Sequence, residues 1–107
     1  LEQGVSQGRL AVEESRAAGH ATHLWVQCWN IPRDREDSVC QTAHAFAKLG
    51  PDTLWAWSFR GGEGTNEACD DPARAWSALV RAFREIKNTS AAETQRRRGQ
   101  QARLHQP

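Results

Sequence analysis

Hydrophobic and polar positions repeat one unit twice along the chain, a β-type run followed by a helix-type run. The β-type runs are His23–Ile31 and Thr53–Arg60, and both are apolar on both faces. The helix-type runs are Asp34–Leu49 and Asp71–Ile86. Strands that are apolar on both faces are typical of a buried parallel sheet. The pattern therefore predicts an α/β fold in which parallel strands are joined through a helix.

Both helix-type runs have an apolar stripe at helical spacing, which predicts one face against a sheet and the other in water. Asp71 is a favourable N-cap for the second run, and Pro72 is a favourable first helical residue. The stripe residues are Val39, Ala43, Phe46 and Ala47 in the first run, and Trp76, Leu79, Val80, Phe83 and Ile86 in the second.

A weaker helical pattern over Val5–Ala18 precedes the first strand, and Gly19 is well placed to end it. The predicted order of elements in residues 1–90 is therefore α-β-α-β-α. Residues 91–107 carry four Arg and one Glu with few apolar groups, which predicts a disordered basic tail. Arg96–Arg98 offer a contact for phosphate or an acidic partner, although a solubilising role is the simpler interpretation.

Two strands buried on both faces need neighbours on both edges, so the two units do not form a closed core alone. A doubly wound sheet and a (β/α)8 barrel both fit. The unusual residues follow the strands, on the side where barrels carry their chemistry. We therefore expect residues 1–90 to be the C-terminal quarter of a (β/α)8 barrel, completed by the remainder of the barrel or by self-association. The sequence contains no Met, so we also expect a processed, trimmed or fragmentary chain.

Composition and charge indicate which classes of partner are not expected for this chain. No apolar stretch has the length that a membrane span requires, so no membrane segment is predicted. Residues 1–90 carry 10 Lys/Arg against 12 Asp/Glu, so a general nucleic-acid surface is not expected there. The sequence does not indicate a cellular compartment.

The three cysteines are Cys28, Cys40 and Cys69, and their odd number and long spacings give no disulfide framework. Cys40 and His44 share a helix face, and His23 can be drawn with them as a metal site. C-x-x-C and H-E-x-x-H spacings are missing from the sequence. We therefore predict neither a metal site nor a cofactor.

Alternation places large aromatic residues on one face of each predicted strand. The residues on these faces are Trp25, Gln27 and Trp29 in the first strand, and Trp55, Trp57 and Phe59 in the second. Flat rings beside amide and guanidinium groups suit stacking on sugar rings or other planar ligands. Packing is the simpler interpretation for Trp25 and Trp55, whereas Trp29 and Trp57 lie near the carboxyl ends of their strands, where either role fits.

Arg60, Gly61, Gly62 and Glu63 directly follow the second strand. Arg60 suits a carboxylate, phosphate or sugar hydroxyl, although an ordinary loop ion pair with Glu63 is the simpler interpretation. The two glycines permit close approach of the backbone to a ligand. The chain does not contain a complete combination of nucleophile, acid and base, so no catalytic residue is predicted. The candidate substrate-binding residues are Gln27, Trp29, Asn30, Trp57, Arg60 and Glu63.

The segments HLWVQCWNIP, DTLWAWSFRGGEG and DDPARAWSALVRAF resemble the last two β-α units of TIM-barrel proteins related to glycoside hydrolases. The resemblance covers roughly residues 5–87. It implies a barrel that binds or hydrolyses carbohydrate, with Trp57 at the floor of the sugar site and a cis peptide after it. The run Gln27–Asn30 stands where the large clan of retaining glycosidases carries its nucleophilic Glu at the end of strand 7. This departure implies either that the two-Glu mechanism does not apply or that its carboxylates come from other strands, and this chain is expected to be inert by itself.

Two other functions remain open. One is a self-associating α/β interaction module without catalysis. The other is a barrel enzyme of different chemistry, such as a phosphate-handling lyase or isomerase. Gly61, Gly62 and Gly64 favour a phosphate site after the second strand, whereas Ile31–Arg35 after the first strand contains no glycine.

Overall fold

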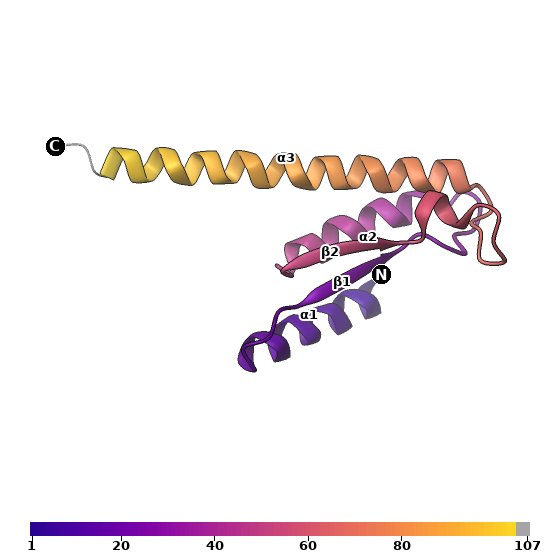
Figure 1. Ribbon diagram of the computed structural model, residues 1–107, viewed down its shortest axis with the longest axis horizontal. Helices are drawn as coiled ribbons and strands as arrows, with labels where there is room; N and C mark the ends of the chain where they lie inside the picture. The colour runs from indigo at the N-terminus through magenta and orange to yellow at the C-terminus, as the bar shows by residue number, and fades with distance from the viewer. Residues whose placement is uncertain (105–107) are drawn as a thin grey trace.

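The computed structural model describes residues 1–104, a small mixed α/β domain with three helices and a two-stranded parallel sheet. The predicted α-β-α-β-α order is confirmed, with a short 3-10 turn added after the second strand (Figure 1). In chain order the elements are α1 (Glu2–Ala17), β1 (His23–Gln27), α2 (Asp37–Lys48), β2 (Thr53–Trp57), η1 (Phe59–Gly62) and α3 (Pro72–Leu104).

The sheet is covered by helices on one face. β1 and β2 are parallel, and their register runs from the pair His23–Thr53 to the pair Gln27–Trp57. Residues along β1 alternate between exposed and buried, beginning with exposed His23 and buried Leu24. α2 packs against the strands and α3 packs along α2, as Figure 1 shows. The other face of the sheet is open to solvent.

Both strands are shorter than the sequence predicts. β1 ends at Gln27 rather than Ile31, and Asn30 then turns the chain with a φ of 51°. β2 ends at Trp57 rather than Arg60, and Arg60 has a φ of 53° inside η1. Positive φ is incompatible with an extended strand. The chain therefore leaves the sheet by turns that non-glycine residues form.

The start of α3 follows the expected signals, whereas α1 begins at Glu2 rather than Val5 and α2 begins later than predicted. Asp34 has a φ of 67°, so the right-handed helix does not begin there as predicted and starts at Asp37. α3 begins at Pro72, as predicted. The Arg74 backbone N–H donates to Asp71 Oδ1 at 3.1 Å, which confirms Asp71 as the N-cap.

The predicted alignment of Phe59 with Trp55 and Trp57 on one strand face is wrong. Because β2 ends before Phe59, η1 carries its ring to α3, where it meets Trp76 edge-on with the ring centroids 5.2 Å apart. The Arg60 guanidinium carbon lies 5.1 Å from the centroid of the Phe59 ring. Phe59 thus packs at the start of α3, away from the sheet face.

The core lies between the covered sheet face and the facing sides of α2 and α3. Val26, Cys28 and Val39 are its largest fully buried side chains. Where α2 meets α3, Ala43 and Ala82 are both fully buried, and such small side chains allow close helix packing. The predicted stripes are confirmed in part: Val39, Ala43 and Leu79 are buried in the core, whereas the buried side of α3 also includes Ala75, Ala78 and Ala82, which the stripe left out. Phe46, Trp76, Phe83 and Ile86 are partly buried against this core.

The basic tail is helical as far as Leu104, so the predicted disorder is wrong for residues 91–104. α3 continues past Ile86, and residues 87–103 are exposed. The packed first half of α3 supplies a helix nucleus, so each later residue only propagates it. Local pairs such as Glu93–Arg97, 3.1 Å apart, add support. The remainder of the predicted tail, residues 105–107, lies outside the described residues.

Burial changes the chemistry of Cys28. Its thiol is fully buried, and burial raises its pKa from 9.0 to about 11, with the neighbouring Cys69 thiol adding to the shift. The folded state therefore keeps the thiol neutral at a pH where the unfolded chain releases its proton. Stability that depends on the neutral thiol is fully present below pH 9 and is lost as the pH rises toward 11.

We expect the free energy of unfolding to fall between pH 9 and 11 by on the order of 2 kcal/mol more than in the Cys28→Ala variant. Urea denaturation at a series of pH values measures the difference. The variant has the same exposed lysines and N-terminus, so it corrects for their titration. Parallel pH profiles for the two proteins would contradict the assignment of the drop to Cys28.

Candidate functional site

The open face of the sheet carries three tryptophans. Trp25, Trp55 and Trp57 keep 54%, 51% and 54% of their surface exposed, although they stand on strands. The Trp25 and Trp55 rings stack with their centroids 5.7 Å apart. Trp25 and Trp55 do not pack in the helix layer, because the helices cover the opposite face. The other packing role expected for them, filling the interior of a barrel, stays a prediction.

Three rows of paired residues make up this open sheet face. The register sets His23 beside Thr53, Trp25 beside Trp55, and Gln27 beside Trp57. His23 Nδ1 hydrogen-bonds Thr53 Oγ1, and the Trp55 indole Nε1–H donates to the same oxygen at 2.8 Å. The row at the carboxyl end therefore pairs an exposed amide with an exposed indole, an arrangement suited to stacking plus hydrogen bonding.

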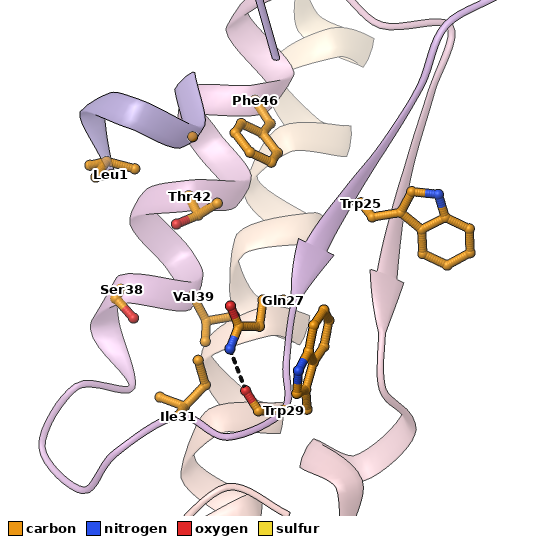
Figure 2. Close-up of a pocket in the computed structure, with 10 residues that line it drawn as sticks. Leu1, Trp25, Gln27, Trp29, Ile31, Ser38, Val39, Thr42 and Phe46 are labelled. Carbon is orange, nitrogen blue, oxygen red and sulfur yellow. Dashed lines mark hydrogen bonds between the residues drawn. The ribbon is translucent and has the colours of Figure 1, made fainter. Parts of the chain in front are cut away.

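A groove of about 360 Å³ runs beside β1 and is shown in Figure 2. Trp25, Gln27 and Trp29 line it from the strand side, and Thr42 and Phe46 line it from α2. The Gln27 amide Nε2 donates to the Trp29 carbonyl oxygen at 2.7 Å, which fixes the side chain across the end of the strand. The groove and the open sheet face therefore share Trp25 and Gln27.

The structure brings together only some of the predicted binding residues. Gln27, Trp29 and Trp57 gather at the carboxyl end of the sheet. Arg60 and Glu63 line a different groove, beside Trp76 at the start of α3. Asn30 is exposed in the loop after β1, and its backbone N–H donates to the Glu67 carbonyl at 2.9 Å. The six candidates thus divide into a strand-end group and a group at the α3 terminus.

The peptide bond between Trp57 and Ser58 is cis, as expected from the sequence. The flanking backbone groups continue the strand pairing. Cys28 N–H donates to the Trp57 carbonyl, and Ser58 N–H donates to the Cys28 carbonyl at 3.2 Å. The chain at the carboxyl end of β2 is therefore held to β1 on both sides of this bond.

The glycine-rich loop is packed against its own chain. A Cβ on Gly61 would lie 2.7 Å from the Pro72 carbonyl oxygen, and one on Gly62 would lie 3.0 Å from the Glu67 carbonyl oxygen. Cys69 N–H also donates to the Gly61 carbonyl at 2.9 Å. Loop packing therefore explains Gly61 and Gly62, which weakens the argument for a phosphate ligand.

The residues of the open sheet face and the groove offer rings, amides and hydroxyls. None of the described residues that line the groove beside β1, or that point from the strands to the open face, is a carboxylate. This arrangement suits binding, and among these described residues it lacks the pair of carboxyl groups that glycoside hydrolysis uses.

No known protein family, curated protein or solved structure matches this chain. Among the described residues, none of the helices is both long enough and apolar enough to cross a membrane.

Proposed function

We propose that this chain forms part of a glycoside-hydrolase-like (β/α)8 barrel, in which the open sheet face lines the barrel and binds carbohydrate at the strand ends. The observation that carries the proposal is the one-sided cover of the sheet. Helices bury one face, whereas Trp25, Trp55 and Trp57 remain about half exposed on the other. In a barrel the helices form the outer ring, and the uncovered face is the interior.

Carbohydrate is favoured as the ligand by the residues at the carboxyl ends of the strands. The faces of sugar rings stack on indoles, and their hydroxyls pair with amides. Trp57 offers the indole, and Gln27 beside it offers the amide. Trp29 extends the aromatic surface into the groove along β1. Ligands of parallel α/β folds bind at this end of the strands.

The role proposed for this chain is binding, with any hydrolysis carried out by residues of other strands. The strand-end residues Gln27, Trp29 and Trp57 provide no proton donor of the carboxyl type. Retaining and inverting glycosidases both require a pair of carboxyl groups beside the scissile bond. By itself the chain is therefore expected to bind a sugar weakly and to leave it uncleaved.

Titration of the chain with soluble oligosaccharides of glucose, xylose, mannose and N-acetylglucosamine tests the proposal. The indole N–H signals of Trp29 and Trp57, followed by NMR, should shift saturably with at least one sugar. The backbone amide signal of Ala91, on the exposed half of α3, is the internal control and should not move. Trp57→Ala should weaken binding at least about tenfold, because it removes a stacking partner worth about 1.4 kcal/mol or more.

Circular dichroism of each protein separates loss of binding from loss of folding. The proposal would be overturned if the chain is folded and the indole N–H signals of Trp29 and Trp57 do not shift with any of the sugars. Equal binding by wild type and folded Trp57→Ala would overturn the assigned site.

A second candidate function, a self-associating interaction module, is favoured by the same open sheet face. Large exposed apolar patches mark interaction surfaces, and a strand edge without a neighbour is a template for pairing with another chain. Two copies of the chain would cover Trp25 and Trp55 by packing these faces together. The native mass of the chain distinguishes this module from the barrel.

A further inference from the structure

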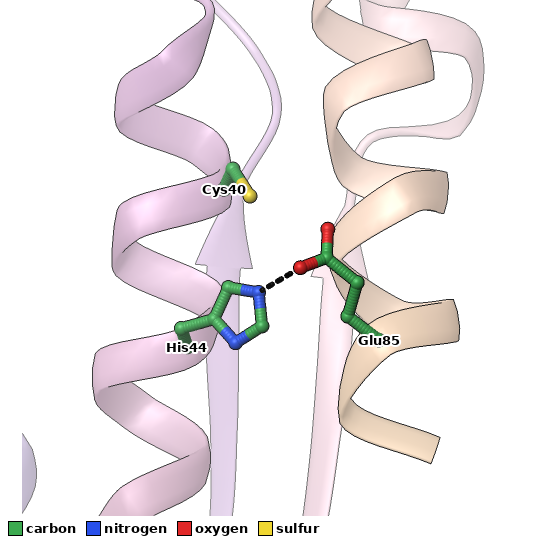
Figure 3. A group of neighbouring side chains, drawn as sticks. All are labelled: Cys40, His44 and Glu85. Atoms are coloured by element: carbon green, nitrogen blue, oxygen red, sulfur yellow. Dashed lines mark ion pairs between the residues drawn. The ribbon is translucent and has the colours of Figure 1, made fainter. Parts of the chain in front are cut away.

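Three metal-binding side chain types meet between α2 and α3. Cys40 and His44 lie one helical turn apart on α2 and direct their side chains toward α3, where Glu85 faces them (Figure 3). The Cys40 sulfur, a ring nitrogen of His44 and a carboxylate oxygen of Glu85 all lie within 4.8 Å of one another. His23, drawn with Cys40 and His44 from the sequence, lies instead on the open sheet face.

The distances approach those of a tetrahedral zinc site. His44 Nε2 and Glu85 Oε2 are 3.4 Å apart. Nitrogen and oxygen ligands at about 2.1 Å from a tetrahedral ion lie about 3.4 Å from each other, so this pair already has the spacing of two zinc ligands. A thiolate ligand lies about 3.5 Å from its neighbours around zinc, so the Cys40 sulfur, within 4.8 Å of the other two ligand atoms, has to approach by about 1.3 Å at most. A side-chain rotation covers that distance.

We propose that Cys40, His44 and Glu85 bind a divalent transition-metal ion, and that the ion links α2 to α3. Thiolate and imidazole donors favour zinc and related ions over magnesium or calcium, which prefer oxygen ligands. Three protein ligands leave a fourth position for water. The site belongs to the helix layer and is independent of the function proposed for the open sheet face.

Arg81 shapes the charge around this cluster. Its Nε lies 3.7 Å from Glu85 Oε1, so the second carboxylate oxygen, Oε2, remains directed at His44. Its Nη2 lies 3.6 Å from Asp37 Oδ1. The guanidinium is thus shared between Asp37 and Glu85 and stays beside the cluster.

The cluster is accessible to an ion from solvent. The side chains of His44 and Glu85 are 35% and 51% exposed, and Cys40 is half-buried. Binding therefore requires no opening of the core. Because its ligands come from two helices that pack together only in the folded chain, the ion should bind the folded state preferentially.

Titration of the metal-free full chain with Zn²⁺ at neutral pH, followed by calorimetry, tests the proposal. We expect one ion per chain, and a rise in the melting temperature with zinc. Co²⁺ should give the visible bands of a tetrahedral ion together with thiolate-to-metal charge transfer. Cys40→Ser, His44→Gln and Glu85→Gln should each weaken Zn²⁺ binding at least about tenfold, as loss of even an outer-shell partner does in metalloproteins.

His20→Gln is the matched control, because His20 is exposed and lies outside the cluster. It should leave the affinity for Zn²⁺ unchanged. Each variant is first shown by circular dichroism to fold as the wild type does. The proposal is overturned if the folded wild type binds no Zn²⁺, or if Cys40→Ser and Glu85→Gln bind it as tightly as the wild type.

Discussion

Gly61→Ala is expected to lower the free energy of unfolding by about 3 kcal/mol or more. Gly61 has a φ of 66°, which is unfavourable for alanine. The added Cβ would also lie 2.7 Å from the Pro72 carbonyl oxygen and 2.9 Å from the Pro72 Cα. Both are backbone atoms at the start of α3, so the clash is relieved only by moving the helix or the loop. Urea denaturation followed by tryptophan fluorescence measures the loss.

Gly64→Ala separates the conformational cost of a positive φ from the cost of the clash with Pro72. Gly64 has a similar φ of 80°, but a Cβ there would meet nothing within 4 Å. It should therefore lose only about 1 kcal/mol, the conformational term by itself. Equal losses for Gly61→Ala and Gly64→Ala would show that the contact with Pro72 is not as close as described.

Ala82→Leu is expected to destabilise the chain by about 2 kcal/mol, since overpacking a filled core forces side chains or backbone to move. Ala82 is 0% exposed on the side of α3 that meets the core. Ala91→Leu on the exposed half of the same helix is the matched control. Leucine and alanine have similar helix propensities, so the control should change stability by less than about 0.5 kcal/mol. A tolerated Ala82→Leu would contradict the close packing of α2 and α3.

The placement of helices and strands could be predicted from the sequence because it follows from local periodicity. The stripe from Trp76 to Ile86 encodes a direction of burial for its helix, whereas the strands, apolar on both faces, gave no sign that Trp25, Trp55 and Trp57 would stay exposed. The Asp71–Pro72 start signal for α3 is likewise local, and it is confirmed by the N-cap hydrogen bond.

The points where the chain leaves the sheet were harder to predict. Asn30, Asp34 and Arg60 adopt positive φ without being glycine. Asn and Asp tolerate that conformation better than most residues, so the first two carry a weak signal, whereas Arg60 carries none. The placement of Phe59 against Trp76 depends on this turn. It could not be inferred from alternation.

Composition led to a wrong prediction of disorder for residues 91–104, which are helical. A polar segment without apolar side chains does not form a core, and that reasoning predicts disorder. A helix that extends from a packed one needs no core of its own, because its nucleus already exists. Residues 87–103 are accordingly exposed and yet helical.

Contacts between distant segments limited prediction of the sites. Cys40 and His44 share a helix face in the sequence pattern, but Glu85 joins them only through the packing of α3 on α2. No spacing motif reports such a pairing. The strand-end group of Gln27, Trp29 and Trp57 could be anticipated, because parallel strands align their carboxyl ends.

The native mass of the folded chain tests most directly whether the open sheet face belongs to a barrel completed by other strands. Light scattering should be combined with far-ultraviolet circular dichroism across a wide range of concentrations. The account predicts a monomer whose Trp25, Trp55 and Trp57 remain accessible to a fluorescence quencher, with no discrete oligomer. A discrete, folded oligomer that protects these three tryptophans would contradict it and would establish the self-associating module instead.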